Sequence, residues 1–381
     1  MTILRTLFIL LVSALSSGCA VLMPRLLPFD DLPRPSGRYA VGTQILQWTD
    51  ENRVEWFTAT ADDKRRLVLQ IWYPTEQATG PAYPYVDHPE QRLTPLAKQM
   101  GLPRFLIEHI QKVNTNGITN AAPAMVSSKA PVILFSHGLG GMKSQNSVQA
   151  EELASQGYFV VAVDHPFDAY LTIFDDGSTA DYRSAEPRPL SPEEFWAFRG
   201  PQLATRTADM KFLLDELTRL NDSGDALWRM LDLDRIGIMG HSFGGATSIM
   251  AAASDPRIKA TIALDGWIIP IPEEQIGAGL RTPFLYIGQS RWDDPVNYQK
   301  LDQLLTNSAS ESRKILLEGT KHFDFSDTPQ FSAFTKRLGI SGSLPREELR
   351  LRLNTEITDF FATHLWKVVV GIRCVEQIEV V

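Results

Sequence analysis

The sequence predicts an α/β fold in which helices cover both faces of a mostly parallel, doubly wound sheet. From residue 131 onward, short apolar runs of strand length alternate with longer stretches of helical periodicity, the pattern of a parallel sheet buried on both faces. A glycine-rich pentapeptide at 240–244 stands where one apolar run meets the next helical stretch. The composition, 44% hydrophobic and 22% charged over 381 residues, is sufficient for a large core.

The expected elements follow in chain order. Two early strands are expected at 40–47 and 66–73, the second ending before Pro74. Parallel strands are expected at 131–135, 159–163, 236–239, 260–264, 284–287 and 314–317. Helices are expected at 144–155, 202–220, 243–253, from about 302 onward and at 346–364. Residues 76–128 and 166–200 break the alternation, and we expect lid-like insertions there because long loops in compact domains are often functional.

The N-terminus has the features of an export signal. A basic residue precedes a short apolar run and a small polar stretch, so residues 1–20 are expected to be an export or lipoprotein signal. Cys19 resembles the acylated cysteine of bacterial lipoproteins, although Ser16 occupies the position where those signals favour leucine. The nearly uncharged stretch 6–23 is about long enough to cross a bilayer, so an uncleaved anchor is the alternative. We expect an exported protein that is periplasmic, membrane-anchored as a lipoprotein, or secreted.

The remaining chain divides into a linker, one domain and a tail. Its prolines make 21–38 an expected linker, 39–366 is expected to form a single domain, and no structure is predicted for 367–381. The net charge of −8 argues against a nucleic-acid partner, because such proteins usually carry a basic face. Only Cys19 and Cys374 occur and no Cys-x-x-Cys pair exists, so neither a disulfide framework nor a cysteine-bound metal is expected.

The pentapeptide Gly240-His241-Ser242-Phe243-Gly244 matches the G-x-S-x-G nucleophile elbow. In that turn the serine is held in a strained conformation between a strand and a helix, and a side chain at either glycine would collide with neighbouring backbone. An apolar strand at 235–239 enters the motif and a helix-forming segment at 246–253 leaves it, as the motif requires. We therefore interpret Ser242 as the nucleophile of an α/β-hydrolase fold, with the positive end of a helix facing the reacting centre.

A serine nucleophile in this fold needs a histidine base and an acid later in the chain. Of the seven histidines, only His322 stands on a loop after the last expected strand. Two aspartates compete for the acid: Asp265 ends the strand at 260–264, whereas Asp293 follows the strand at 284–287, the commoner place. Either can hold the imidazole tautomer, and the spacing alone slightly favours Asp293.

The segment Phe135-Ser136-His137-Gly138-Leu139-Gly140-Gly141 follows an apolar strand, where this fold places one half of its oxyanion hole. Glycines there let backbone N–H groups approach the developing oxyanion, and one such donor is worth roughly 3 kcal/mol in the transition state. The second donor is expected to be the N–H of Phe243. His137 is expected to brace the loop by hydrogen bonding rather than to act in catalysis.

Three stretches of the chain resemble the platelet-activating factor acetylhydrolase family, a group of calcium-independent phospholipases A(2). The stretches are 135–140, 240–247 and Ala263-Leu264-Asp265-Gly266-Trp267. Weaker likeness covers 37–330, and the family usually has alanine in place of Gly266. The resemblance implies that Asp265 is the triad acid and that the N–H of Leu139 is the other oxyanion donor. It reverses the preference for Asp293, which stays as the alternative acid.

We therefore expect a carboxylic ester hydrolase that works by acyl transfer and needs no metal or organic cofactor. The resemblance implies a glycerophospholipid substrate with a short or oxidised acyl chain at the middle position, whereas the residues alone indicate only an ester. A general carboxylesterase or polyester hydrolase is the first alternative, and a non-catalytic cell-surface binding scaffold is the second. A membrane surface is a further candidate partner, through an anchor or through an apolar stripe at 102–110.

Overall fold

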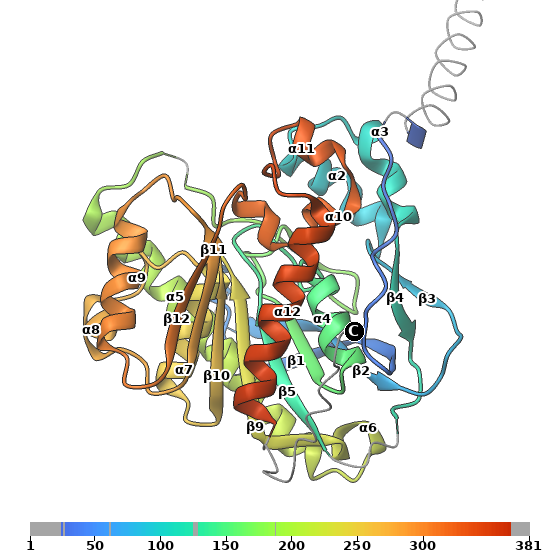
Figure 1. Ribbon diagram of the computed structural model, residues 1–381, viewed down its shortest axis with the longest axis horizontal. Helices are drawn as coiled ribbons and strands as arrows, with labels where there is room; N and C mark the ends of the chain where they lie inside the picture. Colours follow the sequence, from blue (N-terminus) through green and yellow to red (C-terminus); the bar gives the residue numbers. More distant parts are fainter. Residues whose placement is uncertain (1–23, 26, 61, 125–128, 187, 367–381) are drawn as a thin grey trace, which may run out of the picture.

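Ten strands form one sheet through the centre of the molecule (Figure 1). The computed structural model describes residues 24–25, 27–60, 62–124, 129–186 and 188–366. The strands are β1 (Ala40–Val54), β2 (Lys64–Thr75), β3 (Ala82–Pro84), β4 (Asn114–Thr119), β5 (Ala130–Ser136), β6 (Phe159–Asp164), β9 (Leu231–His241), β10 (Ile258–Leu264), β11 (Phe284–Gln289) and β12 (Ser312–Leu317). Their order is β12-β11-β10-β9-β5-β6-β2-β1-β4-β3. Every pairing from β12 to β6 is parallel, and β2 is antiparallel to both of its neighbours, so the expected mostly parallel sheet is confirmed.

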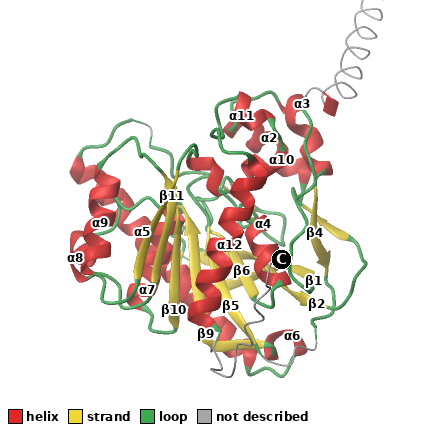
Figure 2. Cartoon of the chain, viewed as in Figure 1, coloured by secondary structure: helices red, strands yellow, loops and turns green. Residues whose placement is uncertain are grey.

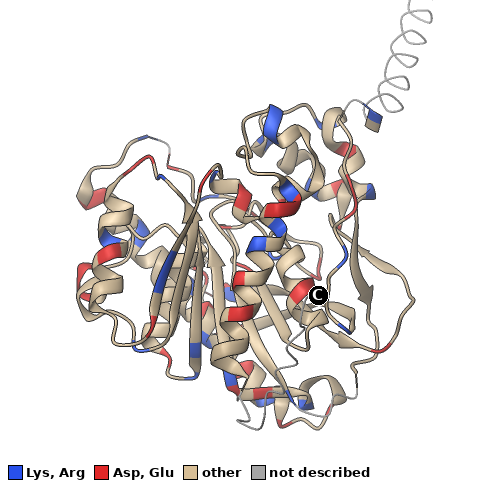
Figure 3. Ribbon diagram, viewed as in Figure 1, with Lys and Arg blue, Asp and Glu red and all other residues tan. Residues whose placement is uncertain are grey.

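Helices cover both faces of this sheet, as a doubly wound fold requires (Figure 2). One face packs against α5 (Pro192–Asn221), α6 (Ala226–Arg229), α7 (Phe243–Ser254), α8 (Glu273–Ala278) and α9 (Val296–Asn307), and the other against α4 (Ser147–Ser155) and α12 (Arg346–Leu365). Alternate residues of β5 serve the two cores: Val132 faces the first and Ile133 the second. Charged residues lie mainly on the covering helices and loops (Figure 3).

The insertions add structure that the pattern did not predict. The first contains β3, β4, α2 (Pro89–Gln99), α3 (Arg104–Ile107) and the 3-10 helix η1 (Glu108–Lys112). Because β4 pairs with β1, this insertion widens the sheet as well as covering it. The second contains a small sheet of β7 (Leu171–Ile173) and β8 (Thr179–Asp181). The stripe expected at 102–110 is not one helical face, because α3 gives way to η1 and Ile110 is buried in the core.

Helix α5 begins at Pro192, well before the expected start at 202. Ser191 and Glu194 form a capping box: the Glu194 N–H donates to the Ser191 hydroxyl, and the Ser191 N–H donates to the Glu194 carboxylate. The helix then continues through Pro201. The expected start was too late, because the favourable cap at Ser191 stabilises a helix that starts further upstream.

The expected linker contacts the domain. The expected linker at 21–38 is irregular from residue 27 onward and packs on the domain: the N–H of Asp30 donates to the carbonyl of Phe331 at 2.7 Å. The predicted signal at 1–20 and the tail at 367–381 lie outside the described residues. Within the described ranges, no helix combines the length and apolarity needed to cross a membrane.

Candidate active site

Ser242 stands at a sharp turn between β9 and α7. Its backbone has φ 55° and ψ −122°, a conformation that costs a residue with a side chain roughly 1–3 kcal/mol. The flanking glycines make room for the turn: a Cβ at Gly240 would collide with the carbonyl of Gly244, and one at Gly244 would collide with the carbonyl of Ser136. The turn therefore has the geometry expected of a nucleophile elbow.

Ser242, His322 and Asp265 form one hydrogen-bonded row. Nε2 of His322 lies 2.9 Å from Oγ of Ser242, and Nδ1 lies 2.6 Å from a carboxylate oxygen of Asp265. Because a carboxylate only accepts, Nδ1 carries the proton and Nε2 accepts the serine hydroxyl. Asp265 is fully buried at the end of β10, whereas His322, in the 3-10 helix η2 (His322–Phe325), is 30% exposed. The fold thus brings together three residues from distant parts of the chain.

The alternative acid, Asp293, does not join this row. It is exposed between β11 and α9, and among the described hydrogen bonds none joins it to His322. The same loop instead supplies donors to Asp265: the N–H of Gln289 at 3.0 Å, its Nε2 at 3.1 Å, and Nε1 of Trp292 at 3.0 Å. Gln289 and Trp292 were not predicted from the sequence. Their place after β11, the strand beside β10, is the signal that could have found them.

His137 braces the loop that follows β5, as expected. Its Nδ1 lies 2.6 Å from the carbonyl of Gly138, and its Nε2 accepts the N–H of His165 at 3.0 Å. Burial, together with the nearby Arg206 guanidinium, lowers the pKa of His137 well below its usual value. The ring is therefore neutral, with its proton on Nδ1 donated to the Gly138 carbonyl.

The braced loop lies directly against the elbow. A Cβ at Gly138 would come within 3.1 Å of Cβ of Ser242, a tight contact that glycine avoids. In the described part of the chain, neither the N–H of Leu139 nor that of Phe243 donates a hydrogen bond. Both predicted oxyanion donors are therefore without a protein acceptor among the described residues.

Both insertions hold this loop from outside. From the first, Nε2 of Gln99 donates to the carbonyl of Gly140 at 2.7 Å. From the second, the carbonyl of Asp168 accepts the N–H of Gly140 at 2.8 Å, and the N–H of Tyr170 donates to the carbonyl of Gly141 at 2.9 Å. The insertions consequently border the site and fix the path of the backbone that carries Leu139.

A second Ser–His–Asp row is buried behind the site. Oγ of Ser136 lies 2.9 Å from Nε2 of His165, and Nδ1 of His165 lies 2.8 Å from Asp209, which also pairs with Arg65 at 2.6 Å. These four side chains are at most 1% exposed. Burial, together with the charge of Arg206, lowers the pKa of His165 to about 3, so the imidazole is neutral. The row cannot meet a substrate, and it anchors the end of β5 from which the loop departs.

Removing the carboxylate of this buried row is expected to destabilise the fold. Asp209→Ala removes one of the two carboxylates that pair with the buried Arg65, leaving only Glu55 at 2.6 Å, and also removes the partner of Arg53 and His165. We expect the free energy of unfolding to fall by roughly 3–5 kcal/mol, measured by urea denaturation. Asp215→Ala is the matched control, because Asp215 pairs with Lys211 and Arg257 at the surface of α5 and the loss of these partly exposed pairs should cost about 1 kcal/mol or less. Equal losses in the two variants would contradict a structural role for the buried row.

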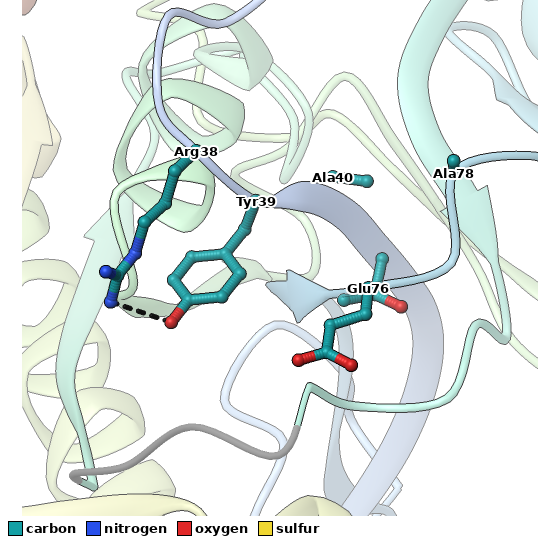
Figure 4. A pocket seen from close by; sticks show the side chains of 6 residues that line it. Arg38, Tyr39, Ala40, Glu76 and Ala78 are labelled. Carbon is teal, nitrogen blue, oxygen red and sulfur yellow. Dashed lines mark hydrogen bonds between the residues drawn. The ribbon is translucent and has the colours of Figure 1, made fainter.

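A separate pocket of about 430 Å³ lies away from the row (Figure 4). It is lined by Arg38, Tyr39, Ala40, Thr75, Glu76 and Ala78. Thr75 ends β2, and because β2 is antiparallel to β6, this pocket lies at the amino ends of the parallel strands, opposite Ser242. Ligands of parallel α/β sheets bind at the carboxyl ends, so the pocket takes no part in the site.

Among the described residues, no cluster of three or more His, Cys, Asp or Glu side chains could hold a metal ion.

Comparisons with known proteins identify the family and the class of reaction. Residues 28–356 match the family described as platelet-activating factor acetylhydrolase, isoform II. Platelet-activating factor acetylhydrolase of Canis lupus familiaris is 27% identical over 319 residues, which are 78% of this chain and 68% of that protein. A probable 1-alkyl-2-acetylglycerophosphocholine esterase of Arthroderma benhamiae is 29% identical, over 62% of this chain and 58% of its own length. A ferulic acid esterase from Streptomyces cinnamoneus has a similar structure, with a TM-score of 0.72 and 26% identity over 88% of this chain and 93% of its own. The chain therefore belongs to the platelet-activating factor acetylhydrolase isoform II family and is a carboxylic ester hydrolase of the α/β-hydrolase fold.

Proposed function

We propose that the chain cleaves esters through an acyl-enzyme formed on Ser242, with His322 as general base and Asp265 as the acid of the triad. The observation that carries this proposal is the unbroken pair of hydrogen bonds, 2.9 and 2.6 Å long, from the serine hydroxyl through the imidazole to the carboxylate. A nucleophile, a base within hydrogen-bond reach and a group that orients the base are the parts that acyl transfer requires.

The reaction follows from these positions. Nε2 of His322 takes the Ser242 proton as the oxygen attacks the ester carbonyl, and the N–H groups of Leu139 and Phe243 stabilise the oxyanion. The same imidazole then protonates the departing alcohol. A water molecule, deprotonated by His322, hydrolyses the acyl-enzyme and releases Ser242. The carboxylate of Asp265 stabilises the imidazolium that forms.

The donors around Asp265 suit it to this role. With His322, Gln289 and Trp292 give its carboxylate four hydrogen bonds, two on each oxygen. These bonds replace the hydrogen bonds to water that the carboxylate loses on complete burial. The Trp292 ring also lies with its centroid 5.2 Å from that of His322 and limits the movement of the base.

The substrate that we propose is a glycerophospholipid with a short or oxidised acyl chain at the middle position. Membership of the family and the names of the dog and fungal relatives support this choice. A general carboxylesterase is the second candidate, and the structural likeness to a ferulic acid esterase supports it. A non-catalytic scaffold is disfavoured, because a binding protein has no need to keep three residues in hydrogen-bonded order.

We further propose that the enzyme is exported and works at a lipid surface. The N-terminal sequence, with Cys19 as a lipidation site, supports export to the periplasm or to a membrane as a lipoprotein. Helices α2, α3 and α11 (Phe334–Arg337) lie together at one end of the molecule (Figure 1). Met100, Phe105 and Leu338 are exposed there by 40%, 47% and 56%, and apolar side chains of this kind favour contact with lipid.

A substrate panel tests the proposed specificity. We expect kcat/KM for phosphatidylcholines with an acetyl group at the middle position to exceed that for long-chain phosphatidylcholines by at least about tenfold, since the energetic cost of excess methylenes accumulates in a restricted pocket. p-Nitrophenyl esters of rising chain length measured beside them separate acyl selectivity from head-group selectivity. High activity on the p-nitrophenyl esters with no turnover of either phospholipid would favour the general carboxylesterase instead.

A further inference from the structure

One side chain joins the oxyanion loop to the nucleophile elbow. Gln145 lies partly exposed just before α4. Its Oε1 accepts the N–H of Gly138 at 3.2 Å, and its Nε2 lies 2.7 Å from Nδ1 of His241. Gly138 directly precedes Leu139, and His241 directly precedes Ser242. The amide therefore bridges the backbone beside one proposed oxyanion donor and the residue beside the proposed nucleophile.

His241 extends this bridge to the base. Its Nε2 lies 3.0 Å from the backbone carbonyl of His322, and the two rings have centroids 4.6 Å apart. Burial, with the nearby His322 ring, lowers the pKa of His241 well below its usual value, so the ring is neutral. The Gly138 N–H can only donate, which turns Oε1 of Gln145 toward it and leaves Nε2 to donate to Nδ1 of His241. The one imidazole proton is then on Nε2 and is donated to the His322 carbonyl.

We propose that Gln145 and His241 are positioning residues that hold the oxyanion donor and the general base in fixed relation to each other. This inference rests on the proposed serine-hydrolase mechanism. The oxyanion loop follows β5 and the base follows β12, so the chain itself does not fix their separation. Catalytic groups must be held within about 0.5 Å of their productive positions, and a displacement of about 1 Å can reduce the rate roughly 100-fold.

The loop that carries the base, His322, has a second anchor. The effect of the bridge on catalysis can therefore be measured apart from its effect on folding. The carboxylate of Asp324 accepts the N–H of Lys321 at 2.8 Å and that of Gly342 at 2.7 Å. Loss of the bond from His241 therefore leaves the loop attached but less closely held. A positioning role predicts that catalysis will fall while the stability of the fold changes little.

The test removes each part of the bridge and then both. Gln145→Met has a similar length without donor or acceptor, and His241→Phe keeps an aromatic ring without its nitrogens. With p-nitrophenyl acetate as substrate, each should lower kcat by roughly 10- to 100-fold while KM stays within about threefold of wild type. The double variant should lose no more than the worse single variant, because both changes break the same bridge. Gln156→Met is the matched control: Gln156 is exposed at the far end of α4, bonds Glu152, and should leave kcat unchanged.

Two results would overturn the inference. One is a kcat of wild-type size in Gln145→Met, and the other is a double variant whose loss is the product of the two single losses, since residues that act separately behave in that way. A failure of the proposed mechanism has a different signature. In that case the wild-type enzyme would not be inactivated at Ser242 by an organophosphate, whatever the Gln145 variants do.

Discussion

Ser242→Ala is expected to abolish ester hydrolysis and to leave the fold intact. Loss of the nucleophile from a Ser–His–Asp triad lowers kcat by roughly a millionfold, because the remaining groups act only with an attacking oxygen in place. Among the described contacts, the Ser242 hydroxyl bonds only His322, so its removal disturbs little packing. The measurements are the turnover of a p-nitrophenyl ester and the thermal unfolding of the variant. Turnover within tenfold of wild type would exclude Ser242 as the nucleophile.

The buried row provides an internal control for this experiment. Ser136 has the same order of partners as Ser242, with a histidine at 2.9 Å and then an aspartate, but it is completely buried. An organophosphate should therefore label Ser242 alone, as read by mass spectrometry of the peptides, and Ser242→Ala should take up no label. A label on Ser136 in the folded enzyme would show that hydrogen-bond order, rather than access, decides reactivity here.

The sequence predicted those features that are encoded locally. The parallel strands are short apolar runs between helical stretches, and every strand expected from 131 onward is present. The elbow at Ser242 could be predicted because it needs its glycines, strand and helix within a few consecutive residues. His322 was singled out because it is the one histidine on a loop after the last strand, and the structure places its ring 2.9 Å from Oγ of Ser242. The sequence did not predict that the insertion at 76–128 adds strands to the sheet, because β4 is short and its pairing with β1 is long-range.

The partners of these residues depend on tertiary contacts that no local pattern records. Gln289 and Trp292 reach Asp265 because β11 lies beside β10. Gln145 reaches His241 because the segment before α4 and the elbow follow the carboxyl ends of the neighbouring strands β5 and β9. The choice between Asp265 and Asp293 was open for the same reason. Both follow adjacent parallel strands, but Asp265 comes directly after β10 and is buried, whereas Asp293 lies further along the loop after β11 and is exposed.

Asp265→Asn is expected to lower kcat by about four orders of magnitude, because the amide presents a donor to Nδ1 of His322 and the imidazole adopts the other tautomer. The surroundings of Asp265 sharpen this expectation. Every group that bonds its two oxygens is a donor: His322, Gln289 and Trp292. An asparagine has one oxygen for them, so its NH₂ group must face another donor and lose a hydrogen bond.

Asp293→Asn is the matched comparison, since it makes the same chemical change on the neighbouring loop. Asp293 is exposed and does not bond His322, so its kcat at saturating substrate should stay within about twofold of wild type, as is usual for surface substitutions. Thermal unfolding of both variants is measured beside kcat, because a loss of stability in Asp265→Asn would otherwise be counted as a loss of catalysis. A large loss in Asp293→Asn with near-normal turnover in Asp265→Asn would move the acid to the loop after β11. The hydrogen bond of 2.6 Å between Asp265 and His322 would then have no part in holding the base.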